Sequence, residues 1–137
     1  MPYAHKTRVP VDKTRLEIER LVRKYGAKGF MSGWHDGSAA QNGKARVEFF
    51  CRDRHIRLTV DVPASEQAAR ERWRAVLLLV KSKLVAVDAK IVTFEQAFVG
   101  EIVMPETGRT VWESVSEPIK LAYQQNKGAI LLPGYDK

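Results

Sequence analysis

The feature that most constrains the fold is a long run of apolar residues at helical spacing in the middle of the chain. After Pro63 and Ser65, the apolar positions keep a 3.6-residue period for five turns, at Trp73, Val76, Leu77, Val80, Leu84, Val87 and Ile91. A helix of about 26 residues would span roughly 40 Å. In a chain of 137 residues, so long a helix must be the element on which the rest of the fold packs.

Two segments before this helix alternate with period two instead. One face of the first carries Ala45, Val47, Phe49 and Cys51, and the other carries Lys44, Arg46, Glu48 and Phe50. In the second, Ile56, Leu58, Val60 and Val62 oppose His55, Arg57, Thr59 and Asp61. Because the charged turn Arg52-Asp53-Arg54 separates the segments, they predict an antiparallel hairpin with one buried and one polar face.

The residues before the hairpin predict one helix and one strand. Thr14 and Glu17 form a T-x-x-E capping box, and apolar residues at helical spacing follow, so we expect a helix over about 13–25 that ends at Gly26. Gly29 to Trp34 predicts a first strand. The segment 35–43 predicts a loop, with a turn at Asn42-Gly43.

The residues after the long helix predict a helical extension. Capping boxes that start at Thr93 and Thr110 predict a short helix ending near Gly100 and a second helix to about Asn126. Pro118 lacks the N–H that a helical turn needs, so we expect it to split or kink the second helix. Between them we expect a brief strand at 102–104 and a turn at 105–108, and the apolar tail 129–137 is expected to dock on the fold.

These elements define a fold class. We expect a single α+β domain over 1–137, with an N-terminal helix, a three-stranded antiparallel sheet, a long helix packed on the sheet, and a C-terminal helical extension over 93–137. Residues 1–11 are expected to form a flexible arm. The element order resembles that of the double-stranded-RNA-binding domain, which implies lysines at the start of the second helix. Residues 65–69, Ser-Glu-Gln-Ala-Ala, contain none, so the chain departs from that pattern.

Residues suited to catalysis or metal binding are sparse. The only histidines are His5, His35 and His55, and no pair has metal-ligand spacing. Cys51 is the only cysteine and alternates with apolar residues, so we interpret it as a core residue. We interpret the dipeptide His35-Asp36 as part of a solvated loop. We therefore expect a protein that is not an enzyme, with no catalytic residues, no metal and no cofactor.

The chain also lacks the marks of a membrane or exported protein. No apolar run approaches the roughly 20 residues that a membrane-spanning helix requires, and residues 1–10 contain no apolar stretch of signal-peptide length. One cysteine cannot form an internal disulfide, which suits a reducing compartment. We expect a cytoplasmic protein without a membrane partner.

Positive charge provides the main functional hypothesis. The net charge is +7, and residues 1–83 hold 18 Lys and Arg against 9 Asp and Glu, whereas residues 84–137 hold 5 against 7. This asymmetry favours a polyanionic partner such as DNA or RNA. The candidate binding residues are those of the polar sheet face, the hairpin tip and one flank of the long helix: Lys44, Arg46, Phe50, Arg52, Arg54, Arg57, Arg70 and Arg74. The alternative is that these cations only solvate the surface.

A family resemblance adds context. The segment Arg72 to Glu113 reads RWRAVLLLVKSKLVAVDAKIVTFEQAFVGEIVMPETGRTVWE, and the chain opens with V-P-V-D-K-T-R-x-E-I-E-R-L followed by Y-G-A. In the R-W-R-A, K-x-K-L, T-F-E and G-R-T-V-W motifs it resembles small uncharacterised proteins carried by bacteriophages and prophages. The resemblance implies a phage-encoded intracellular protein and assigns no catalytic residues.

Three functions are consistent with these features. The first is a phage or prophage accessory protein that binds nucleic acid through a basic sheet face. The second is a protein-interaction module that inhibits or modulates a host defence or replication enzyme. The third is a small structural protein that forms a homo-oligomer through the long helix or the apolar tail.

Overall fold

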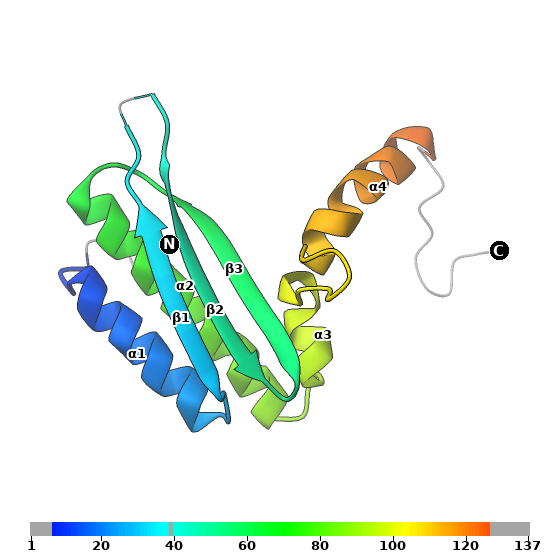
Figure 1. Cartoon of the computed structure of the whole chain (residues 1–137), viewed down its shortest axis with the longest axis horizontal. Coiled ribbons are helices and arrows are strands. Elements are labelled where there is room, and N and C mark those ends of the chain that lie inside the picture. Colours follow the sequence, from blue (N-terminus) through cyan, green and yellow to red (C-terminus); the bar gives the residue numbers. More distant parts are fainter. Residues whose placement is uncertain (1–6, 39, 127–137) are drawn as a thin grey trace.

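The fold is a three-stranded antiparallel sheet with helices on one face, followed by a helical extension. The computed structural model describes residues 7–38 and 40–126. The elements in order are α1 (Val11–Lys24), β1 (Gly29–His35), β2 (Gly43–Cys51), β3 (Arg54–Val62), α2 (Glu66–Asp88), α3 (Phe94–Phe98), the 3₁₀ turn η1 (Val99–Glu101) and α4 (Val111–Gln125). The strand order is β1-β2-β3, and α1 and α2 lie side by side behind the sheet (Figure 1). The predicted α+β fold class is confirmed.

The hairpin of β2 and β3 has the predicted faces. Cys51 pairs with Arg54, so the connecting turn has only two residues, Arg52 and Asp53. Both residues have positive φ values, 51° and 62°, as the two central residues of a type I′ hairpin turn require. The resulting register places the alternating apolar residues of both strands on the helical side, where Val47, Phe49, Ile56 and Leu58 are buried.

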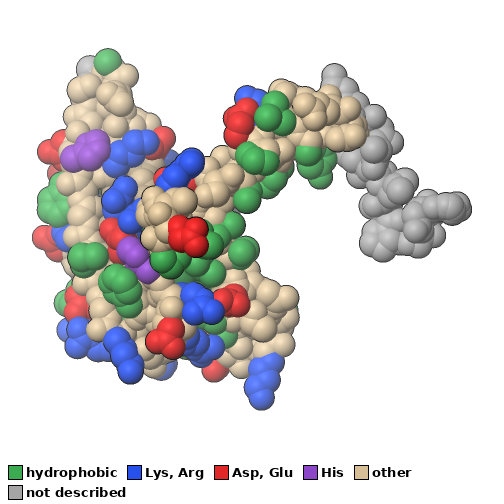
Figure 2. Space-filling model, turned by 45° about the vertical axis from the view of Figure 1, so that its right-hand side comes forward, with side chains coloured by type: hydrophobic (Ala, Val, Ile, Leu, Met, Phe, Trp, Pro, Cys, Tyr) green, Lys and Arg blue, Asp and Glu red, His purple; other side chains and the backbone are tan. Residues whose placement is uncertain are grey.

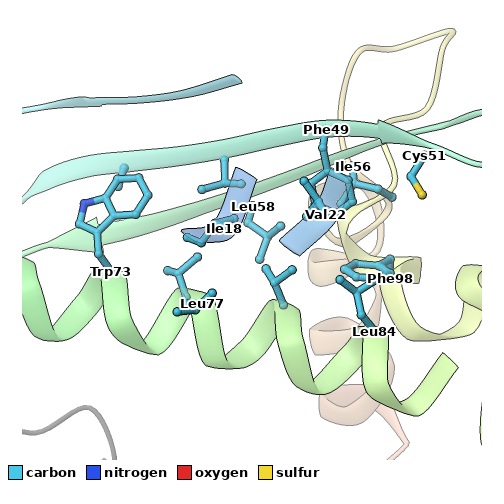
Figure 3. Close-up of a cluster of buried hydrophobic side chains, with 14 of the residues drawn as sticks. Ile18, Val22, Phe49, Cys51, Ile56, Leu58, Trp73, Leu77, Leu84 and Phe98 are labelled. Carbon is cyan, nitrogen blue, oxygen red and sulfur yellow. The ribbon is translucent and has the colours of Figure 1, made fainter. Parts of the chain in front are cut away.

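The core lies between the sheet and the two long helices. Trp73, Leu77 and Leu84 of α2 point toward the sheet, and Ile18 and Val22 of α1 fill the space beside them (Figure 3). At the far end Phe98 of α3 meets Phe49 edge to face, with ring centroids 5.7 Å apart. The long helix is therefore the packing surface that its apolar period predicts. Cys51 is buried in the same cluster, and burial raises the pKa of its thiol.

The first helix begins earlier than its T-x-x-E box predicts. It starts at Val11 after Pro10, without a side-chain cap, and Thr14 lies inside the helix and is buried. Instead of capping α1, the Thr14 hydroxyl and the Glu17 carboxylate accept hydrogen bonds from Arg74 of α2. Val11 of the predicted flexible arm over 1–11 belongs to α1, and residues 1–6 of the arm lie outside the described part of the chain.

The long helix α2 ends at Asp88, so Ile91, predicted to lie in its apolar stripe, is instead 76% exposed. The helices after α2 begin where the capping boxes predict. Both Thr93 with Gln96 and Thr110 with Glu113 form complete capping boxes. The segment 102–104 forms no strand in the described residues, only isolated bridges from Ile102 to Ile56 and from Val103 to Thr110.

The last helix projects from the rest of the fold. It contacts η1 at its start and extends away from the sheet (Figure 1). Pro118 lies within α4, which continues as one helix from Val111 to Gln125. Of the two predicted effects of Pro118, a split or a kink, the split is therefore wrong. None of the described α4 residues is buried. The tail that was expected to dock, 129–137, lies outside the described residues.

Candidate functional site

The open face of the sheet carries four of the eight predicted binding residues. Lys44, Arg46 and Phe50 of β2 and Arg57 of β3 lie on the side opposite α1 and α2. Exposed Met31 of β1 pairs with Glu48 on the same side. Figure 2 shows Lys and Arg side chains on this face interspersed with acidic, histidine and hydrophobic ones. The face is therefore mixed in character and has no continuous basic surface.

Glu48 is the centre of a charged cluster on this face. Its carboxylate lies 2.6 Å from His55 Nε2, 3.3 Å from Arg57 Nε and 4.0 Å from Arg46 Nη1. Partial burial alone raises the pKa of Glu48, but the hydrogen bonds from His55 and Arg57 outweigh it, and the pKa lies below its ordinary value. Two of the predicted phosphate-binding arginines thus contact a carboxylate of their own chain.

The other residues of the open face are also engaged within the chain. Lys44 donates to Asp61 across the β2–β3 pair, and this hydrogen bond lowers the pKa of Asp61. The Phe50 ring stacks on His55 with centroids 4.5 Å apart at 25°, yet Phe50 remains 43% exposed. Phe50 is therefore partly accessible to a ligand, as the nucleic-acid hypothesis requires.

The remaining four candidates lie away from the open face. Arg54 donates to Glu95 of α3 at 2.6 Å, and the Arg52 guanidinium lies 5.4 Å from the Phe94 ring centroid. On α2, behind the sheet, Arg70 pairs with Glu66 and Arg74 pairs with Glu17. Of the seven predicted cations, six have a carboxylate within 4.0 Å; these are Lys44, Arg46, Arg54, Arg57, Arg70 and Arg74.

An uncovered apolar stripe on α4 is the feature that sequence reasoning missed. Its residues recur at i, i+3, i+7 and i+11, the spacing of one helix face; this α4 stripe consists of Trp112, Val115, Ile119 and Tyr123. Trp112 is 57% exposed and Tyr123 63%. The same period could be read in the sequence, but its exposure depends on the direction in which α4 leaves the fold.

A groove lies beside the base of α4. It has a volume of about 1010 Å³ and separates the end of the β2–β3 hairpin from η1 and the residues that precede α4. Its lining includes the apolar residues Phe50, Val99, Ile102 and Met104, and we call it the Phe50 groove. Cations from the strand ends also line it: Lys28, Arg52 and Arg54.

A second, smaller hollow of about 390 Å³ lies at the opposite end of the sheet. Trp34, Trp73 and the predicted loop pair His35 and Asp36 are among its lining residues. The nearby Arg15 guanidinium lies 4.6 Å from the Trp34 ring centroid, and it donates hydrogen bonds to the side chain and carbonyl of Ser32. Over residues 7–38 and 40–126, no group of three or more His, Cys, Asp or Glu residues is arranged to hold a metal ion.

In comparisons with known proteins, the chain matches no family model, no curated protein and no solved structure. The resemblance to phage proteins therefore stays a prediction. No helix in the described part of the chain combines the length and the apolar character needed to cross a bilayer.

Proposed function

We propose that this protein is a protein-interaction module whose binding element is the α4 stripe. The observation that carries the proposal is the exposure of Trp112, Ile119 and Tyr123 along one side of a helix that has no buried residue in the described chain. Tryptophan and tyrosine are the residues that contribute most to binding at protein interfaces. Spacing of i, i+3, i+7 and i+11 is how an amphipathic helix inserts into the groove of a partner.

The energetics of α4 support the same proposal. A helix of 15 residues is marginal in water without tertiary packing, and Pro118 removes one of its backbone hydrogen bonds. Burying a large apolar side chain contributes about 1.5–3 kcal/mol. A partner that covers the α4 stripe would therefore stabilise the helix as well as bind it.

The polar side of α4 stays available to solvent in such a complex. Glu113 and Glu117 lie on the side opposite the stripe, with Lys120 as the basic residue of this segment. A matching partner presents an apolar groove that receives the stripe and leaves these charged side chains in water. The module would bind such a protein without help from the sheet face.

Binding of nucleic acid is a second candidate function. It is favoured by Phe50, which is 43% exposed on the open face, and by the exposed side chains of Lys44, Arg46 and Met31 on the same face. Exposed ion pairs are worth only about 0–1 kcal/mol, so a phosphate could replace Asp61 as the partner of Lys44. Glu48 and Asp61 on the same face oppose a polyanion, and for this reason we rank this function second.

Affinity purification with a matched pair of variants tests the first proposal. The tagged protein is incubated with a nuclease-treated bacterial lysate, in parallel with the stripe variant Trp112→Ala/Tyr123→Ala and the polar-side control Lys120→Ala. We expect a stoichiometric protein partner that survives nuclease, stays with the control and is lost from the stripe variant. Equal recovery with all three proteins would overturn the proposal. Circular dichroism confirms that the variants keep the fold.

Fluorescence polarisation with short single- and double-stranded oligonucleotides tests the second candidate. Affinity should fall by roughly one power of ten per tenfold rise in salt for each phosphate contacted. Binding that does not change up to 300 mM salt, or that survives Arg46→Ala/Phe50→Ala, would exclude the open face as a nucleic-acid site.

A further inference from the structure

We infer that the outer side of α2 binds the same side of a second copy of this chain, so that two α2 helices pack antiparallel about a two-fold axis. This inference goes beyond the proposed function, because it concerns a surface on a different helix from the α4 stripe. It rests on an uncovered apolar stripe, on residue sizes that match in one antiparallel register, and on two charges that the same register pairs.

The long helix α2 is apolar on two sides. One side carries Trp73, Leu77 and Leu84, which point toward the sheet (Figure 3). The other side carries a second set of residues, which we call the α2 outer stripe: Leu78, Ser82, Val85 and Ala89, bordered by Leu79 and Ala86. Val85 is 48% exposed and Leu79 44%. A helix that packs on a sheet with one side normally carries polar residues on the other, so the outer stripe indicates a second packing surface.

The residue sizes along the α2 outer stripe match those of the same stripe reversed. The spacing of four, three and four residues is that of a coiled-coil seam. In one antiparallel register, Leu78 lies opposite Ala89 of the second copy, and Val85 lies opposite Ser82. The two-fold axis repeats both contacts, so every layer joins one larger and one smaller side chain. Such alternation lets two helices pack closely without voids.

The charges beside the stripe favour a second copy as the occupant. Arg70, Arg74 and Lys83 of α2 each have a carboxylate of their own chain within 4.0 Å. Lys81 and Asp88, which flank the outer stripe on one side two turns apart, make no ion pair within residues 7–38 and 40–126. In an antiparallel helix pair the same flank of both copies meets, so each Lys81 faces Asp88 of the other copy.

The register that matches the residue sizes also pairs these charges. It leaves Lys81 and the opposing Asp88 two residues apart in level, or about 3 Å along the helix axis, which a lysine side chain can span. Asp88 is the last residue of α2, and no basic residue lies in the last turn. The negative end of the helix dipole disfavours a carboxylate there, and Lys81 of the second copy would offset this cost. A parallel helix pair would bring Lys81 toward Leu79 and Ala86 and leave both charges unpaired.

Sedimentation velocity over a range of protein concentrations tests the inference, with two charge reversals that are specific to this register. Lys81→Glu alone makes both charge pairs of the dimer acidic, and Asp88→Lys alone makes both basic. We expect the unchanged protein to sediment at twice 15.5 kDa. Each variant should associate about tenfold more weakly or worse, because like charges then oppose each other.

An equimolar mixture of the two charge variants provides the decisive step. Each heterodimer of Lys81→Glu with Asp88→Lys contains two opposite-charge pairs, so the mixture should associate about as strongly as the unchanged protein. The control Lys120→Glu reverses a charge on α4 and should leave the association unchanged. Circular dichroism confirms that all variants keep the fold.

The contrary results are equally specific. A monomeric unchanged protein at all concentrations, charge variants that associate like the unchanged protein, or a mixture as weak as either variant alone would overturn the inference. Loss of the dimer in Trp112→Ala/Tyr123→Ala would place the interface on α4 and would overturn it as well. The proposed function is decided separately by the affinity purification, in which Lys81→Glu should still retain the partner of the α4 stripe.

Discussion

Arg74 of α2 donates a hydrogen bond of 2.8 Å to the carboxylate of Glu17 on α1, and this contact joins the two helices behind the sheet. The same guanidinium donates to the buried Thr14 hydroxyl at 3.2 Å. The hydrogen bond from Arg74 holds the pKa of Glu17 below its ordinary value. Arg74 therefore has a structural role in helix packing, although its sequence position made it a candidate phosphate ligand.

Replacement of Arg74 should destabilise the fold. We expect Arg74→Ala to lower the free energy of unfolding by about 1–2 kcal/mol, because it removes charge-assisted hydrogen bonds and leaves two acceptors behind. Urea denaturation measures the change. Arg72→Ala, at an exposed position of the same helix, is the control and should cost less than about 0.5 kcal/mol. Equal losses in the two variants would contradict the role assigned to Arg74.

The hydrogen bonds and ion pairs of Glu48 should make the free energy of unfolding decrease as the pH falls into the acid range. Its pKa in the folded protein lies below the ordinary value of 4.5, so its contribution is complete above that value and is lost as the pH falls through the folded pKa. We expect Glu48→Gln to be less stable than the unchanged protein at pH 7, and the difference to shrink as the pH falls from 4.5 through the lowered pKa of folded Glu48. Urea midpoints at several pH values measure this. Glu106→Gln, at an exposed turn, is the control, and a constant offset for Glu48→Gln at every pH would show the prediction to be wrong.

Loss of the α4 capping box should destabilise α4 and leave the stability of the rest of the fold unchanged. Thr110 N–H donates to Glu113 Oε1 at 2.7 Å, and Glu113 N–H donates to the Thr110 hydroxyl at 3.2 Å. We expect Thr110→Ala to cost about 1 kcal/mol of helix stability, whereas Thr110→Ser keeps the cap. Hydrogen exchange should show faster exchange over α4 and unchanged protection in α2. Loss of protection throughout the chain would mean that α4 is not an independent extension.

The effect of substitutions at Asp53 on stability should reflect the backbone conformation of the two-residue turn between β2 and β3. Asp53 has a φ of 62°, a region that glycine enters without a steric penalty and that β-branched residues avoid. We expect Asp53→Gly to change the free energy of unfolding by less than about 1 kcal/mol in either direction, and Asp53→Val to destabilise by more than that. Thermal melts of both variants measure the difference, and similar melting temperatures would contradict the turn assignment.

Local patterns in the sequence predict most of this fold. The period of two in 44–51 and 55–62, the period of 3.6 after Ser65 and the boxes at Thr93 and Thr110 depend on neighbours within a few residues, so they identify the right elements. The T-x-x-E sequence at Thr14 does not cap α1. Its Thr14 hydroxyl and Glu17 carboxylate instead accept hydrogen bonds from Arg74, 60 and 57 residues away. Contacts between distant elements of this kind cannot be read from a local pattern.

The same limit applies to the candidate sites. The pairing of Lys44 with Asp61 follows from the hairpin register, and Glu66 with Arg70 from helical spacing, so both could be predicted once the turn was placed. The pairing of Arg54 with Glu95 could not, because it depends on where α3 packs. Likewise the spacing of Trp112, Ile119 and Tyr123 predicts an apolar helix face. Only the direction of α4 shows that this face is uncovered.

Site-specific photocrosslinking tests the central claim most directly, because it asks whether another protein covers the α4 stripe in cells. A photoreactive phenylalanine analogue is placed at Ile119, on the stripe, or at the adjacent Lys120, on the polar side, and bacteria that express either protein are irradiated. The account predicts a discrete protein adduct from position 119 and none from position 120. No adduct from either position, or equal adducts from both, would contradict it.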